Sequence, residues 1–345
     1  MEYFLGIDYP TLWFLIVGAL LSAYGILEGF DLGSGSLHIF LRQDQSRRIN
    51  INAIAPIWDA NQVFLIIGGG ALFAGFPVMY AALMSSMYIP FMVFLFFLVL
   101  RAMAIKYRSA EDKAWWRTAW DWIYFVSNVS ISFLLGVVVG NVLQGLAIDK
   151  DLEYKGGVFF GFFSFYSVLV GLTSVSLFMM QGAAFLLLKT QDKLYARLTM
   201  ILRNAVVFFL VSFSFTSLYT LVFIEGVVEN FREEPEYFIV PVFTFLAVAN
   251  IPRLIRQKKY ELVFVFSSLT TAFLMMLVAL QLYPVLLPST IDSKFNITIY
   301  NAASSMKSLE IMLLFAAVGT PLIGLYMWNL YKTFRGKVEL DDFSY

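Results

Sequence analysis

The chain has 345 residues, of which 60% are hydrophobic and only 14% are charged, and soluble domains typically carry roughly 25% charged residues. Its 24 basic and 24 acidic residues cancel, so the basic surface that nucleic-acid binding requires is not indicated, and we expect no nucleic-acid partner. There is no Cys and a single His, His38, which excludes disulfides, Cys-ligated zinc and bis-His haem within this chain. The composition indicates an integral membrane protein.

Long apolar runs predict nine membrane-spanning helices joined by short loops. A span needs about 20 apolar residues, and such runs lie at about 11–40, 54–74, 77–100, 121–147, 158–187, 199–224, 238–252, 262–283 and 309–331. We therefore expect an all-α bundle of nine transmembrane helices that forms one transmembrane domain over residues 1–345. A multi-pass protein of this kind has the lipid bilayer as its surroundings.

The basic residues are distributed unevenly over the loops of this nine-helix arrangement. Alternate loops, beginning with the one after the first span, hold 19 of the 24 Lys and Arg. The other loops hold only Lys150, Lys155, Arg232, Lys294 and Lys307. Because basic residues concentrate in cytoplasmic loops, the N-terminus is predicted outside and the C-terminus in the cytoplasm.

Three acidic residues lie within the predicted spans on the cytoplasmic side. Glu28 and Asp31 are three residues apart in the first span, which places them on one helical face. Asp59, followed by Asn61 and Gln62, lies near the start of the second span at a similar depth. Acids are costly inside a bilayer and commonly serve proton transfer there, so these three are candidates for a proton route from the cytoplasm.

A purely structural role for the same acids stays open at this point. They could pair with basic residues and anchor the helix ends, the available partners being Arg42, Arg47, Arg48 and Arg101. By the same logic Asp121 is predicted to pair with Arg117, four residues before it on one face.

Other polar and small residues favour helix packing. Asn141 and Gln144 are expected to bond another helix across the bundle. Two groups of glycines are expected to permit close helix approach, namely Gly29, Gly33 and Gly35, and Gly68, Gly69 and Gly70.

Six stretches together resemble one protein family. They are "GFDLGSG" (29–35), "INAIAPIWDANQVFLIIGGGALFAGFPVMYA" (51–81), "WDW" (120–122), "GNVLQG" (140–145), "FVFSSLT" (264–270) and "LPST" (287–290). In this order they are similar to subunit II of cytochrome bd, the bacterial quinol oxidase. The resemblance extends over nearly the whole chain, and the 51–81 stretch is the most specific.

The resemblance implies a heterodimer with subunit I in the bacterial cytoplasmic (inner) membrane, with small single-helix accessory subunits as further partners. The complex would oxidise quinol and reduce oxygen to water. Haem b and haem d would be held by subunit I, and this chain would ligate no cofactor or metal. Oxygen reduction consumes cytoplasmic protons. Asp31 and Asp59 both match the family pattern, and the resemblance implies that they help to deliver these protons. Glu28 stands where a relative has Asp, which keeps an acid on a longer side chain.

A second class of function is a proton-coupled secondary transporter, because the same buried acids in a many-helix bundle fit that class as well. No pair of interrupted helices and no polar cluster at the membrane midplane is evident in the sequence to support it.

Overall fold

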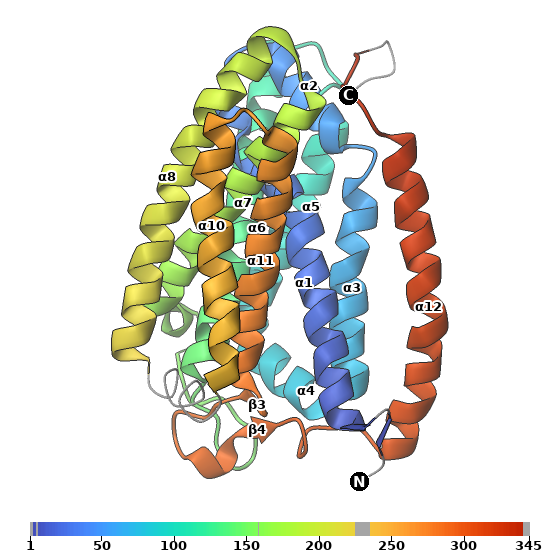
Figure 1. The fold of residues 1–345 in the computed structure, drawn as a ribbon, viewed down its shortest axis with the longest axis vertical. Coiled ribbons are helices and arrows are strands. Elements are labelled where there is room, and N and C mark those ends of the chain that lie inside the picture. Colours follow the sequence, from blue (N-terminus) through green and yellow to red (C-terminus); the bar gives the residue numbers. More distant parts are fainter. Residues whose placement is uncertain (1–2, 5, 158, 225–234, 341–345) are drawn as a thin grey trace.

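The computed structural model describes residues 3–4, 6–157, 159–224 and 235–340, which form an elongated bundle of helices (Figure 1). In chain order the long helices are α1 (Tyr9–Ser36), α3 (Trp58–Gly75), α5 (Tyr88–Tyr107), α6 (Ala114–Gln144), α7 (Phe165–Lys189), α8 (Asp192–Phe223), α10 (Ile239–Arg256), α11 (Tyr260–Leu282) and α12 (Met306–Thr333). Two shorter helices are α2 (Asp44–Ile54) and α4 (Pro77–Ser86).

The remaining elements are short and lie in the connections. Four 3-10 turns are η1 (His38–Phe40), η2 (Phe160–Phe162), η3 (Pro235–Phe238) and η4 (Ser293–Phe295). Two small antiparallel strand pairs are β1 (Tyr3–Phe4) with β2 (Ile7–Asp8), and β3 (Val285–Leu287) with β4 (Ile297–Thr298). The protein is therefore predominantly helical, as predicted, with minor strands outside the bundle.

The number of spans agrees with the prediction in its coarse form. Among the described residues, eight helices are long and apolar enough to cross a membrane, and a ninth span results if α2 and α3, bent by 47°, count as one. α1 begins and α12 ends at opposite ends of the bundle (Figure 1), as an odd number of crossings requires. The connections α1–α2, α5–α6, α7–α8 and α10–α11 share one end, which we call the cation-rich end. Arg232 lies outside the described residues.

The predicted span at 77–100 is wrong in its bounds. The chain forms the separate helix α4, breaks at Met87, and starts the long helix α5 at Tyr88. Pro77 and Pro90 lie in the first turns of the two helices, where a missing backbone N–H costs no helical hydrogen bond. Because both helices are apolar, hydropathy along the sequence does not reveal the break between them.

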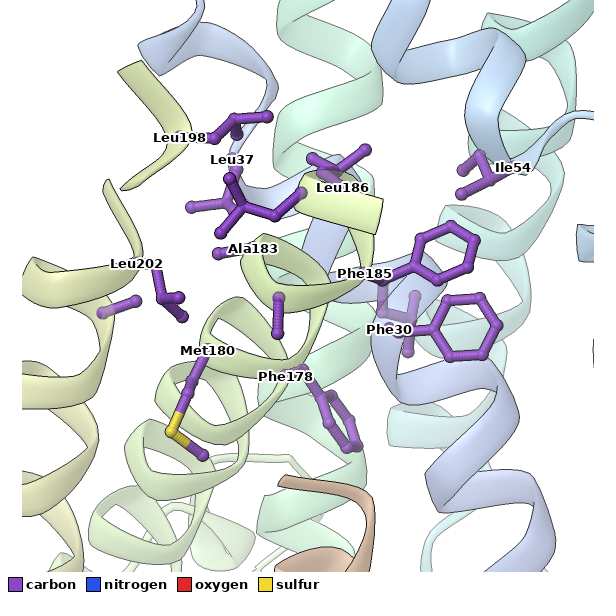
Figure 2. Packing of buried hydrophobic residues seen from close by; sticks show 14 of the residues in the cluster. Phe30, Leu37, Ile54, Phe178, Met180, Ala183, Phe185, Leu186, Leu198 and Leu202 are labelled. Carbon is purple, nitrogen blue, oxygen red and sulfur yellow. The ribbon is translucent and has the colours of Figure 1, made fainter. Parts of the chain in front are cut away.

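Helix α7 occupies the centre of the bundle and α12 its periphery. Of the 25 residues of α7, 16 are buried, whereas of the 28 residues of α12 only Leu309 and Met327 are buried. Figure 2 shows Met180, Ala183 and Leu186 of α7 near Leu198 and Leu202 of α8, while α7 side chains also meet Phe30 of α1. α12 therefore depends on few contacts with the rest of the chain.

Glycines allow α1 and α7 to touch backbone to backbone, as predicted for the first glycine group. A Cβ on Gly33 would lie 1.7 Å from the carbonyl oxygen of Phe178, and a Cβ on Gly182 would lie 2.3 Å from the amide nitrogen of Ser34. The same expectation is wrong for Gly69 and Gly70 within this chain, because no atom of the described residues lies within 4 Å of such a Cβ.

Asn141 and Gln144 bond to the segment that leads into α7, the next long helix along the chain, and not to a helix across the bundle as predicted. Asn141 Nδ2 donates to the carbonyl oxygen of Phe162 at 2.8 Å, and Ser164 Oγ donates to Gln144 Oε1 at 2.5 Å. Ser164 also caps α7 by accepting from the amide of Ser167. α6 and α7 are thus fixed at the end opposite the cation-rich end.

Candidate functional site

Glu28 and Asp31 face the interior of the bundle from the half of α1 that approaches the cation-rich end. Both residues have a relative exposure of 0%. Their three-residue spacing puts the two carboxyl groups on one side of α1. The sequence prediction that they share a face is confirmed, and both lie in a part of the protein where an ionised group is expensive.

Arg101 of α5 is the charged partner of Glu28. Its Nη1 donates to Oε1 of Glu28 in a salt bridge whose two side chains are each 1% exposed. The same Nη1 lies 3.3 Å from Oε1 of Gln62, and the guanidinium carbon lies 5.8 Å from the ring centroid of Trp58. Of the four arginines that the sequence offers as partners, Arg101 is the one that pairs with Glu28.

Asp31 is held by an amide instead of a cation. Asn61 Nδ2 of α3 donates to Asp31 Oδ2 at 2.7 Å, and the hydroxyl of Tyr331 on α12 donates to Asn61 Oδ1 at 2.8 Å. These two bonds fix the orientation of the Asn61 amide, because its nitrogen faces an acceptor and its oxygen faces a donor. Tyr331 is a member of the site that sequence reasoning missed, since no local pattern relates residues 61 and 331.

Asp59 does not join the two buried acids. It lies in the first turn of α3 and is exposed. Its carboxylate makes no hydrogen bond or ion pair with any described residue. The structure thus brings Glu28 and Asp31 together and leaves Asp59 at the outer surface of the bundle, at the cation-rich end.

Several polar atoms around the two acids have no hydrogen-bond partner in the described part of the chain. They are Glu28 Oε2, Asp31 Oδ1, Arg101 Nε and Nη2, and the hydroxyl of Tyr124. A buried polar atom left unpaired costs about 1–3 kcal/mol, and buried water commonly bonds such groups. One oxygen of each carboxylate is therefore free to bind water or a proton.

A second ionic cluster lies closer to the cation-rich end and is centred on Asp121 of α6. Its Oδ1 accepts from Arg108 Nε at 2.5 Å and its Oδ2 accepts from Arg47 Nη1 at 2.8 Å. The predicted pair with Arg117 is wrong, since Arg117 instead contacts Asp44 and Asp112. Arg47 and Arg108 come from other segments of the chain, and helix periodicity says nothing about such partners.

His38 also belongs to this cluster, and both of its ring nitrogens have a hydrogen-bond partner. Its Nε2 lies 2.6 Å from Asp121 Oδ1, and its Nδ1 lies 3.1 Å from Nδ2 of Asn50. Asn50 Nδ2 also donates to the carbonyl oxygen of Ser34 at 3.0 Å, so Nδ2 is the donor and His38 Nδ1 the acceptor. The ring is then neutral, with its proton on Nε2 directed at Asp121. His38 therefore does not fit the role of a haem ligand in this chain.

The ring of Tyr124 lies between the two clusters. It contacts the His38 ring edge-to-face at 5.0 Å between centroids. Its unpaired hydroxyl lies close enough to Glu28, Asp31 and Arg101 to interact with them electrostatically. Tyr124 is fully buried, and its position in an apolar span gives no sequence signal of this contact.

Glu28 also borders a large apolar cavity. The cavity has a volume of about 740 Å³ and is lined by side chains of α1, α5, α6, α7 and α11, among others. Within the described residues no group of three or more His, Cys, Asp or Glu side chains is placed to hold a metal ion. The chemistry available at the site is accordingly that of carboxylates, an arginine and tyrosine hydroxyls.

Comparisons with known proteins identify relatives along nearly the whole chain. The family model described as cytochrome bd terminal oxidase subunit II matches residues 9–334. The chain is 33% identical over 371 residues to cytochrome bd-I ubiquinol oxidase subunit 2 of Escherichia coli (strain K12), covering 97% of both chains. It is 33% identical over 334 residues to cytochrome bd ubiquinol oxidase subunit 2 of Bacillus subtilis (strain 168), covering 95% of this chain and 96% of that protein.

A solved structure shares the fold. A chain in the structure of bd oxidase from Geobacillus thermodenitrificans superposes with a TM-score of 0.77 at 18% identity, covering 94% of this chain and 98% of that one. The identity is low, so this likeness concerns the arrangement of helices alone. With the family model spanning α1 to α12 and two relatives matched along their length, the chain belongs to the cytochrome bd terminal oxidase subunit II family.

Proposed function

We propose that this chain is the non-haem subunit II of a bacterial quinol:oxygen oxidoreductase. It would pair with a subunit I that holds haem b and haem d and oxidises quinol, joined by small single-helix accessory subunits. The observation that carries the proposal is the match of two quinol oxidase subunits over at least 95% of this chain. The comparisons do not favour the transporter alternative.

The cation-rich end is the cytoplasmic face in this proposal. It holds most of the 24 Lys and Arg, as expected for the cytoplasmic side of a bacterial inner-membrane protein. The N-terminus then lies outside and the C-terminus in the cytoplasm. We take residues 1–345 as one transmembrane domain. With the cation-rich end in the cytoplasm, Glu28 and Asp31 would lie in the inner half of the bilayer.

The second part of the proposal is that Asp31 and Glu28 bind and release protons on their way to the site of oxygen reduction in subunit I. Each keeps one unpaired oxygen, Oδ1 and Oε2 respectively, where water or a proton can bind. Asn61 cannot readily pass a proton through its amide, so it holds Asp31 in position while Arg101 balances the charge of Glu28. Asp59, exposed at the cation-rich end, would collect protons at the surface.

The test uses the complex co-expressed with subunit I and carrying Asp31→Asn, Glu28→Gln or Asp59→Asn. We expect quinol-driven oxygen consumption and proton uptake to fall at least tenfold in Asp31→Asn, with unchanged haem content. Asp112→Asn is the matched control, because the side chain of Asp112 is 100% exposed at the same end. Normal turnover in Asp31→Asn and Asp59→Asn with intact haems would reject the proton route and leave an anchoring role.

A further inference from the structure

A groove between α10 and α11 opens on the outer face of the bundle. It has a volume of about 540 Å³, and its lining includes the apolar side chains Phe243, Leu246, Phe266 and Phe273. Phe243 and Phe273 stack with their ring centroids 6.1 Å apart. The two helices lie side by side at the surface of the bundle (Figure 1). An apolar groove on the outer face of a membrane-spanning bundle has the chemistry that suits an acyl chain.

Two polar side chains line the same groove at its end nearer the cation-rich end. Asn250 and Arg253 are three residues apart on α10, and so share a face. Neither side chain makes a hydrogen bond or ion pair with any residue the structure describes. An amide and a guanidinium that both lack a protein partner form a donor pair suited to a phosphate, which guanidinium groups bind in a bidentate manner.

The adjoining turn adds positive charge with little to balance it. Arg256, Lys258 and Lys259 are exposed directly after Arg253, and Glu261 is the acid of this segment. Lys and Arg residues near a membrane surface each attract anionic lipids by about 1 kcal/mol. The potential at the groove mouth therefore favours an anionic headgroup over a zwitterionic one.

The length of the groove matches one leaflet of a bilayer. From Phe243 to Arg253 is ten residues of α10, or about 15 Å at 1.5 Å per residue. The hydrocarbon core of a bilayer is about 30 Å thick, so half of it spans the same length. With Arg253 at headgroup level, the stacked phenylalanines lie near the bilayer midplane.

We propose that this groove is a binding site for one anionic phospholipid of the cytoplasmic leaflet. Arg253 and Asn250 bind the phosphate oxygens, and an acyl chain lies between α10 and α11 against Phe243, Phe266 and Phe273. The site uses no residue of the Glu28–Asp31 cluster. It is therefore independent of the proposed proton route, and a failure of either leaves the other standing.

The test is lipid titration of the purified two-subunit complex, followed by native mass spectrometry. Phosphatidylglycerol and phosphatidylcholine of equal chain length are the probes. Arg253→Gln removes the charge, and Ala249→Phe fills the groove at a lining position without changing charge. Arg203→Gln is the matched control, since Arg203 on α8 is exposed at the same end, has no partner among the described residues and does not line the groove. Unchanged haem spectra verify that each complex is assembled.

We expect Arg253→Gln to weaken phosphatidylglycerol binding about fivefold, and Arg203→Gln to leave it unchanged. Ala249→Phe should lower the binding of both lipids, because it blocks the acyl chain. Equal phosphatidylglycerol binding by the unmodified complex and Arg253→Gln would overturn the proposal. So would equal affinity for the two lipids, or a polypeptide helix occupying the groove in a density map of the complex.

Discussion

Replacing Arg101 by Gln should destabilise the protein more than replacing its partner Glu28 by Gln. The two side chains are each 1% exposed, and removing one member of a buried pair typically costs about 3–5 kcal/mol. Without Arg101, Glu28 and Asp31 face each other without a cation. Two unit charges about 5.5 Å apart repel by about 3 kcal/mol at an effective dielectric constant of 20, so we place Arg101→Gln at the upper end of that range.

Glu28→Gln should lower the free energy of unfolding less than Arg101→Gln does. Arg101 still has Asp31 nearby, and the new amide oxygen of Gln can still accept a hydrogen bond from Arg101. We expect a loss of about 1.5–3 kcal/mol, the value of a hydrogen bond to a charged group. The loss in free energy of unfolding in the double variant should be smaller than the sum of the losses in the two single variants by about 1–3 kcal/mol. The assay is the free energy of unfolding of the purified complex in a denaturing detergent, with Arg203→Gln as the exposed control. Equal losses for the two single variants, or effects that add within about 0.5 kcal/mol, would refute this account.

Three further outcomes follow from the same contacts. Gly33→Ala should lower the free energy of unfolding by at least about 3 kcal/mol through overpacking. Gly18→Ala on the same helix, where no described residue lies within 4 Å of the new Cβ, should be neutral or slightly stabilising in the same assay. Asp121→Asn should lower the free energy of unfolding by about 3–5 kcal/mol, and the exposed Asp112→Asn by under about 1 kcal/mol. Similar losses in the two variants would contradict the conclusion that the Asp121 cluster is buried. The backbone amide of Glu153 and Lys155 hold the pKa of the Asp149 carboxyl below its usual value. Ionised Asp149 therefore stabilises its loop at pH values above the ordinary Asp pKa of about 3.9, and this stabilisation is lost as the pH falls through the lowered pKa. An NMR titration in which the pKa of the Asp149 carboxyl is not lowered would contradict this prediction.

Class, spans and family could be predicted from the sequence because they depend on local chemistry. A run of apolar residues has to satisfy its own backbone inside lipid, which forces a helix wherever the run is long enough. The spacing of Glu28 and Asp31 fixed their common face through helical periodicity, and the structure agrees. The error at 77–100 has the same origin, since apolarity alone does not separate α4 from α5.

The partners of the polar residues could not be predicted, because they come from distant parts of the chain. Arg101 reaches Glu28 across 73 positions, and Tyr331 reaches Asn61 across 270. Asp121 prefers Arg47 and Arg108 to the local Arg117. Such choices depend on which helices pack against each other, as α1 does with α3 and α5 does with α6.

By itself, the sequence determined that this protein is a membrane-embedded helical bundle of the bd oxidase subunit II family, with two acids on one face of its first span. Only the tertiary structure decided that Glu28 and Asp31 are buried together with Arg101 and Asn61 while Asp59 stays exposed. The physical reason is that a helix fixes the direction of its own side chains through backbone hydrogen bonds, whereas their partners are fixed by close packing between helices, which a linear pattern does not encode.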